Sequence, residues 1–163
     1  MNKKKWIVNL IISMLFAAML SGCKGVEDKS KTHEGMAYIE AMDYESALDS
    51  FAQAKEKKEN EELIARGEGI AYMGKMDYAK AVSSFEESLG YCYGNVGNLE
   101  VDTNYYLAAA YYRNDELQKA IAAYSSIIGY RPKESDAYYK RGTVELEYNQ
   151  YDNAVVDFDK ASP

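Results

Sequence analysis

Two stretches of this chain carry the same pattern of small and aromatic residues. Residues 35–54 read GMAYIEAMDYESALDSFAQA and residues 69–88 read GIAYMGKMDYAKAVSSFEES. In both stretches, Tyr stands three and nine positions after the first Gly, Ala stands twelve positions after it, and Phe stands sixteen positions after it. The recurrence of the whole pattern, first from Gly35 and then from Gly69, indicates an internal repeat.

Two further copies complete the array. Residues 108–127 read AAAYYRNDELQKAIAAYSSI and residues 142–161 read GTVELEYNQYDNAVVDFDKA, so these copies have the same offset as the first two. Both keep the Ala and an aromatic residue at the same two spacings. The step from the second copy to the third, Gly69 to Ala108, is longer than the others. The five additional residues fall in the Gly- and Asn-rich segment 90–102, which is typical of a loop.

The spacing within each copy predicts a pair of helices joined by a short turn. Apolar residues recur at three and four positions, as on one face of a helix. The expected helices are 29–41, 44–57, 62–75, 78–90, 102–114, 117–130, 135–148 and 151–161. We expect Gly35, Gly69, Ala108 and Gly142 to let the paired helix approach closely, because they have almost no side chain. Ala47, Ala81, Ala120 and Ala154 should meet the first helix, with Phe51, Phe85, Tyr124 and Phe158 filling the core. Asp43, Asp77 and Asp115 are candidates to cap the second helix of their units.

This helix–turn–helix pattern, with its period of about 34 residues, resembles the tetratricopeptide repeat. The resemblance covers residues 28–163 and implies an all-α solenoid, a right-handed superhelix of four units at about 28–61, 62–95, 101–134 and 135–163. Proteins of this family bind segments of other proteins, so the resemblance implies a scaffold and not an enzyme.

The N-terminus has the features of an export signal. Lys3, Lys4 and Lys5 precede an apolar run at 6–20, which is short for a membrane-spanning helix of about 20 residues. The following Leu20-Ser21-Gly22-Cys23 resembles the lipobox of bacterial lipoproteins. That resemblance implies a signal peptide at 1–22 and a diacylglycerol (acyl lipid) on Cys23, followed by a short tether at 23–28. The protein would then be anchored at the extracytoplasmic face of the cell membrane. Lys24 stands where an inner-membrane retention signal would have Asp, which leaves the outer membrane open for a Gram-negative source.

Charge and residue usage exclude several function classes. The net charge is −7, and it becomes −10 when the three lysines of the predicted signal peptide are left out. A nucleic-acid-binding protein should have the opposite sign, and direct adhesion to anionic lipid is also disfavoured. His33 is the only histidine, so we expect neither a catalytic triad nor a metal site, and no cofactor besides the lipid.

The resemblance places the binding surface on the first helix of each unit, along the concave side. By helical spacing, the inward positions form an aromatic and aliphatic groove with a few cations. They are Met36, Ile39, Glu40, Arg66, Ile70, Met73, Tyr105, Ala109, Tyr112, Arg113, Tyr139, Thr143 and Leu146. Packing between helices is the alternative role for Met36 and Ile70. The Lys/Asn/Arg set with which some family members bind a C-terminal carboxylate is absent, so capture of chaperone tails is not supported.

Two other regions leave alternatives open. Val155 and Val156 are expected to be partly exposed at the end of the array, where a partner or a second copy could stack. A tolerated surface insertion explains the 90–102 segment most simply, and a loop in which Tyr91 and Tyr93 contact a partner is the alternative. Cys92 is either a small half-buried filler or half of an intermolecular disulfide.

Overall fold

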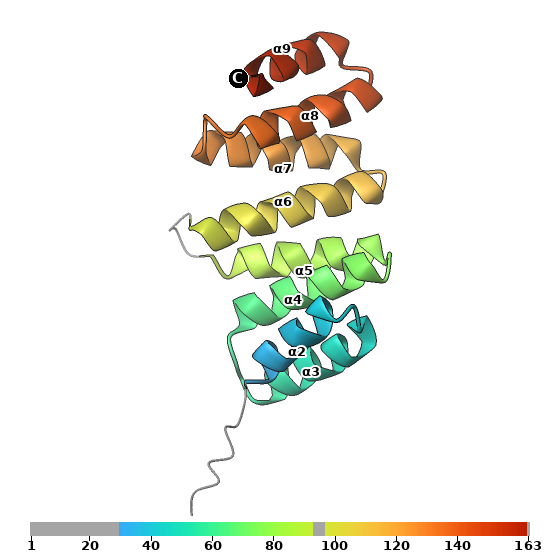
Figure 1. Cartoon of the computed structure of the whole chain (residues 1–163), viewed down its shortest axis with the longest axis vertical. Coiled ribbons are helices and arrows are strands. Elements are labelled where there is room, and N and C mark those ends of the chain that lie inside the picture. Colours follow the sequence, from blue (N-terminus) through green and yellow to red (C-terminus); the bar gives the residue numbers. More distant parts are fainter. Residues whose placement is uncertain (1–29, 93–96, 163) are drawn as a thin grey trace, which may run out of the picture.

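The computed structural model describes residues 30–92 and 97–162, which form eight helices and no strand. The predicted signal peptide, Cys23, the predicted tether and Tyr93 lie outside the described residues. The helices are α2 (Lys31–Glu40), α3 (Tyr44–Glu56), α4 (Glu61–Gly74), α5 (Tyr78–Gly90), α6 (Asn98–Arg113), α7 (Leu117–Tyr130), α8 (Ser135–Glu147) and α9 (Tyr151–Ala161). Each packs on the next along the chain, so that α9 and α2–α3 lie at opposite ends of an elongated stack (Figure 1). The first helices also touch one another, α2 with α4 and α4 with α6.

The helices follow the predicted ranges closely, with one clear difference in the segment where the repeat period changes. Helix α6 begins at Asn98 and not at residue 102, so the connection from α5 is shorter than the predicted 90–102 loop. The additional turn buries Val101, which is 1% exposed, and Arg131 Nη2 donates to Asn98 Oδ1 at 2.6 Å. Burial of Val101 therefore outweighs the loop composition of the segment.

Every first helix ends in the same left-handed turn. The residue that closes the turn has a positive φ of 60–64°, and it is Met42, Met76, Asp115 or Asn149 in the four units. The N–H of the next residue bonds to the carbonyl five positions back, as from Asp43 to Tyr38 at 2.9 Å. This pattern satisfies carbonyls that a helix C-terminus leaves unpaired. It fixes the angle between the two helices of a unit without requiring Gly.

The capping prediction is confirmed for two of the three aspartates. Asp43 accepts from the Ser46 N–H at 3.2 Å and Asp77 from the Lys80 N–H at 3.3 Å. The prediction for Asp115 is wrong, because Asp115 lies one position earlier, at the left-handed residue. Glu116 occupies the cap position of α7 and its side chain makes no capping hydrogen bond.

Small residues let the aromatic side chains of the second helices fill the space between units. Phe51 is 0% exposed, and a Cβ at Gly35 would lie 2.6 Å from its Cε1. A Cβ at Gly67 would lie 2.3 Å from Phe51 Cζ, so the ring is held between α2 and α4. A Cβ at Gly69 would likewise lie 2.5 Å from Phe85 Cε1. The predicted close approach at Gly35 and Gly69 is confirmed.

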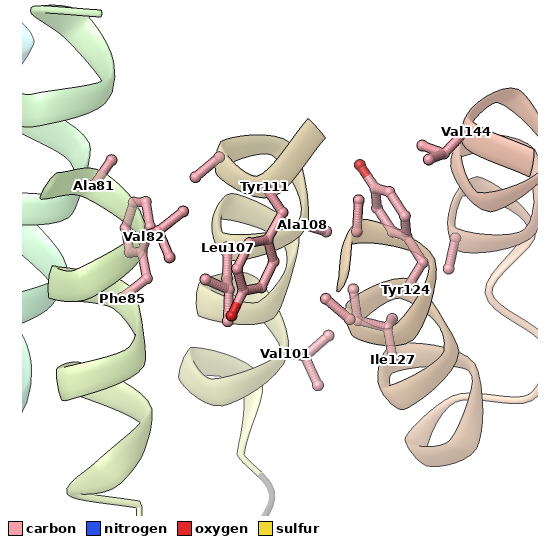
Figure 2. Packing of buried hydrophobic residues seen from close by; sticks show 14 residues of the cluster. Ala81, Val82, Phe85, Val101, Leu107, Ala108, Tyr111, Tyr124, Ile127 and Val144 are labelled. Atoms are coloured by element: carbon pink, nitrogen blue, oxygen red, sulfur yellow. The ribbon is translucent and has the colours of Figure 1, made fainter. Parts of the chain in front are cut away.

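The core continues from unit to unit without a break between α5 and α8. Figure 2 shows side chains of α5, α6 and α7 pointing into the spaces between the helices, with Tyr124 of α7 beside Val144 of α8. The four predicted Ala positions are all buried: Ala47, Ala81, Ala120 and Ala154. The repeat therefore buries one row of small residues against one row of aromatic ones.

The last unit contains a buried ion pair that connects α8 and α9. Arg141 donates to both carboxylate oxygens of Asp157, at 2.6 and 2.8 Å, and to Ser125 Oγ at 2.8 Å. Glu145 is buried beside this pair, and its Oε2 has no hydrogen-bond partner. Burial, and next the charge of Asp157, raise the pKa of Glu145 above its ordinary value.

Candidate protein-binding groove

The structure places every predicted groove residue on a first helix. These residues form rows of repeat-equivalent positions: Ile39, Met73, Tyr112 and Leu146 in one row, Met36, Ile70 and Thr143 in another, and Arg66, Tyr105 and Tyr139 in a third, with Arg113 at the end of α6. Because α2, α4 and α6 touch in sequence, the rows run across neighbouring helices of the stack.

Most of these side chains in the first three units are only half-exposed. Met36 and Ile39 pack against the core of the first unit, while Ile70, Met73, Tyr105 and Tyr112 pack against the larger core of the later units. They contribute to packing between helices and still present part of their surface. In the fourth unit, Tyr139, Thr143 and Leu146 are exposed.

The tyrosines of the groove are positioned by contacts with neighbouring helices. Tyr112 donates from its hydroxyl to Glu147 Oε2 at 2.6 Å, across to α8. Tyr105 lies edge-on to Tyr124, with ring centroids 6.2 Å apart, and its buried hydroxyl has no partner. Burial, followed by the charge of Glu134, raises the pKa of Tyr105 well above its usual range. Both phenols therefore stay protonated at neutral pH, and Tyr112 acts as a donor to Glu147, whereas the Tyr105 hydroxyl is unpaired.

A hollow of the described surface lies between α2 and α4. It is a cavity of about 610 Å³ lined by Ser30, Thr32, His33, Met36, Glu59, Asn60, Leu63 and Arg66. The structure thus brings together two predicted groove residues, Met36 and Arg66, and the remaining predicted residues lie outside this cavity. Leu63 was missed, although it lies three positions before Arg66 and hence on the same helix face.

Glu59 forms one wall of the cavity and holds the N-terminus of α2. It accepts from the Lys31 N–H at 2.8 Å, from the Thr32 N–H at 2.9 Å and from Thr32 Oγ1 at 2.6 Å, and also from Ser30 Oγ. The hydrogen bonds from Ser30 and Thr32 lower the pKa of Glu59 to about 2. No feature of the repeat pattern marks this role, because Glu59 lies between two units and acts on residues almost thirty positions earlier.

Arg66 makes few contacts for a half-buried guanidinium. Its guanidinium carbon lies 5.3 Å from the ring centroid of Tyr106, a cation–π contact with α6. Its Nε is buried without a hydrogen-bond partner, and none of the ion pairs among the described residues involves Arg66. Tyr106 in turn stacks on Phe85 at 5.6 Å. The cation is therefore held in position and lacks an anion.

Cys92 and its surroundings fit the filler role better than the disulfide role. The thiol is half-buried, and Sγ donates to Glu62 Oε1 at 3.4 Å. Burial, followed by the contact with Glu62, raises the pKa of Cys92 to about 11. A thiol with so little thiolate at neutral pH reacts slowly in disulfide exchange.

In the described part of the chain, no helix is long and apolar enough to cross a membrane.

The comparisons with known proteins agree with this architecture. A family model described as the tetratricopeptide repeat matches residues 102–133. The crystal structure of MamA is similar to this chain with a TM-score of 0.69 and 21% identity, over 80% of this chain and 74% of that one. A structure titled "MamA RS-1 ArsTM double mutant" has a TM-score of 0.70 at 19% identity, over 80% of this chain and 71% of that one. No curated protein sequence matches the chain.

At these identities the likeness to MamA establishes the fold, and the family model identifies the repeat. The predicted all-α fold of repeated helix pairs is confirmed. The chain therefore has a fold of repeated helix pairs like that of MamA, and its residues 102–133 match the tetratricopeptide repeat.

Proposed function

We propose that this protein is an interaction scaffold that binds an extended or helical segment of another protein along the first helices of its repeats. The observation that carries the proposal is the series of half-exposed aromatic and aliphatic side chains on α2, α4 and α6, of which Met36 also lines the cavity beside Arg66. Clefts of about 300–1,000 Å³ with apolar walls and a few polar groups are the usual form of a binding site. Fixed tyrosines offer large contact area at a low entropic cost.

We further propose that the scaffold works outside the cytoplasm, tethered to a membrane through a lipid on Cys23, and that its partner is a protein of the cell envelope. The support is the sequence: the charged start, the apolar run and the LSGC box agree with one another. One acyl chain binds a membrane only marginally and two bind firmly, as a diacylglycerol would. Residues 24–30 span at most about 25 Å when extended, so α2 would begin close to the lipid surface.

The anchor is tested by acyl labelling of cells that express the protein. We expect wild-type protein to incorporate a labelled fatty acid and the Cys23→Ser variant to lose the label. The matched control is Cys92→Ser, which removes the other thiol and should keep the label. Labelling that persists in Cys23→Ser would rule out this anchor.

A second candidate function is that of a structural subunit, which assembles with a partner or a second copy through the end of the stack. Val155 is 60% exposed, whereas Val82 at the equivalent position of the second unit is 7% exposed. The next unit covers this position in the middle of the stack, and in the described residues no helix covers it in the last unit. Val156 and Tyr151 add to the exposed apolar surface of α9.

Site-specific photocrosslinking in the native membrane separates the two functions. Leu146 in the groove and Val156 at the end of the stack have nearly equal exposure, 49% and 51%, so a crosslinking residue at either site has the same access to solvent. We expect a discrete adduct with a second protein from position 146 and none from position 156. An adduct from position 156 alone would favour the structural subunit, and the absence of an adduct from both would contradict both functions.

A further inference from the structure

We propose that the cavity between α2 and α4 recognises an acidic residue beside an apolar one in the partner segment, with the carboxylate on Arg66 and the apolar side chain against Met36 and Leu63. This inference rests on the proposed scaffold function and names the chemistry of its partner. It concerns a side-chain carboxylate within a segment, and it needs no free C-terminus.

Arg66 supplies the first argument. Other half-buried cations of the described chain have a carboxylate partner, as Arg141 has Asp157 at 2.6 Å. Among the described residues, Arg66 has the face of Tyr106 and no carboxylate partner. A guanidinium that is partly withdrawn from water favours a carboxylate, which it can bind with two parallel hydrogen bonds.

The carboxylate that lines the same cavity does not fill this role. Glu59 lines the same cavity, yet its oxygens accept hydrogen bonds from Ser30, Lys31 and Thr32. The N-terminus of α2 carries a partial positive charge that these contacts engage. The negative charge of Glu59 is therefore committed to the fold, and the charge of Arg66 remains available to a ligand.

The walls of the cavity account for the apolar half of the motif. Leu63 is 39% exposed although it is aliphatic, and Met36 is half-exposed on the facing helix. A Met side chain adapts its shape to different apolar groups. Burial of both side chains by a ligand would gain the usual hydrophobic free energy of transfer.

The position of the guanidinium is set before any ligand arrives. Arg66 lies on Tyr106, and Tyr106 stacks on Phe85, which is fully buried. A guanidinium held in place by these stacked rings loses little side-chain entropy when it binds a carboxylate. This arrangement favours a site that prefers segments with a carboxylate over segments without one.

The test is a selection from a displayed library of random peptides on the full-length chain, purified in detergent. We expect the enriched peptides to carry Asp or Glu next to a large apolar residue. A synthetic peptide from this set should bind about tenfold more tightly than the same peptide with Gln in place of its Glu. The Arg66→Gln variant should lose that difference, and Lys133→Gln, which removes an equal charge from an exposed site outside the groove, should keep it.

The outcomes separate this inference from the function on which it rests. Enriched peptides without acidic preference, or a preference that survives in Arg66→Gln, would overturn the inference and leave the scaffold function standing. No enrichment at all would overturn both. If Arg66→Gln failed to fold, Arg66→Lys would replace it, with the preference expected to weaken because Lys lacks the planar fork. A gain in peptide affinity on Glu27→Gln would show that the chain's own N-terminal segment competes for the cavity, and would overturn an external partner.

Discussion

Replacing Gly67 by Ala perturbs the Phe51 ring, which is confined by glycines of two helices. The added Cβ would lie 2.3, 2.7 and 2.9 Å from three ring atoms of Phe51, far inside ordinary contact distance. The ring has little room to move away, because it also lies close to α2, where a Cβ added at Gly35 would be 2.6 Å from Phe51 Cε1. The Phe51 side chain is fully buried, so the strain must be absorbed by separation of α2 and α4.

The expected magnitude follows from two opposing effects. Overpacking of a filled core costs about 1–3 kcal/mol, whereas Ala in place of Gly inside a helix gains up to about 1 kcal/mol. We therefore expect Gly67→Ala to lower the free energy of unfolding by about 1–2 kcal/mol. Urea denaturation followed by far-ultraviolet circular dichroism measures this change. The matched control is Gly129→Ala in α7, where nothing lies within 4 Å of the added Cβ and the propensity gain should appear alone.

A double-mutant cycle tests whether Phe51 is the cause. Phe51→Leu removes the distal ring atoms, so Gly67→Ala should be neutral or stabilising in that background, with a coupling energy of about 1–3 kcal/mol. Gly67→Ala as stable as wild type, or equally destabilising with and without the ring, would refute the reasoning. Either result would mean that the two helices do not depend on this close approach.

Three further predictions concern pH, reactivity and backbone conformation. The pKa of Glu145 is raised in the folded state, so the free energy of unfolding should fall as pH rises from about 4.5 through the folded pKa. The Glu145→Gln variant should flatten this dependence in urea titrations between pH 4 and 8, and it should raise the free energy of unfolding at pH 7 by on the order of 1 kcal/mol. A destabilised variant would contradict this prediction. Cys92, with a pKa raised to about 11, should react with a thiol-specific disulfide reagent at least tenfold more slowly in the folded chain than in urea. A dimer band on a non-reducing gel that disappears in Cys92→Ser would count against that prediction. Met76 has a φ of 61°, a backbone conformation that Asn tolerates and β-branched residues avoid. Met76→Asn should therefore raise the melting temperature, and Met76→Val should lower the free energy of unfolding by about 1 kcal/mol. Equal effects of the two substitutions would be inconsistent with a conformational cause.

Much of the fold could be predicted from the sequence because it depends on local periodicity. The Ala and aromatic positions recur at the same places in each copy of the repeat. The structure buries the four Ala residues and Phe51, Phe85 and Tyr124 as expected, whereas Phe158 of the last unit is only half-buried. The glycines of the first helices also had a local explanation in the aromatic residue sixteen positions later, as for Gly35 and Phe51. Each of these predictions concerns residues within one unit.

The failures lie where units meet or where the repeat pattern is altered. Helix α6 starts early because Val101 is buried, and burial depends on neighbouring helices that the Gly- and Asn-rich segment does not reveal. Asp115 shows that a shift of one position changes a cap into a left-handed turn residue. Gly67 contacts Phe51 of the preceding unit, whereas its equivalent in the next unit is Tyr106, which stacks on Phe85.

The candidate site divides in the same way. The sequence placed Met36 and Arg66 on the inner helices, because helical spacing decides which face a side chain occupies. It also determined the helix pairs, the net negative charge and the export signal that we propose, all of which are properties of composition and local order. Only the tertiary structure decided that Glu59 is committed to the N-terminus of α2 and that Arg66 lies on Tyr106 without an anion. Those facts depend on contacts between residues about thirty to forty positions apart, and the energy of a charge is set by the groups that surround it in space.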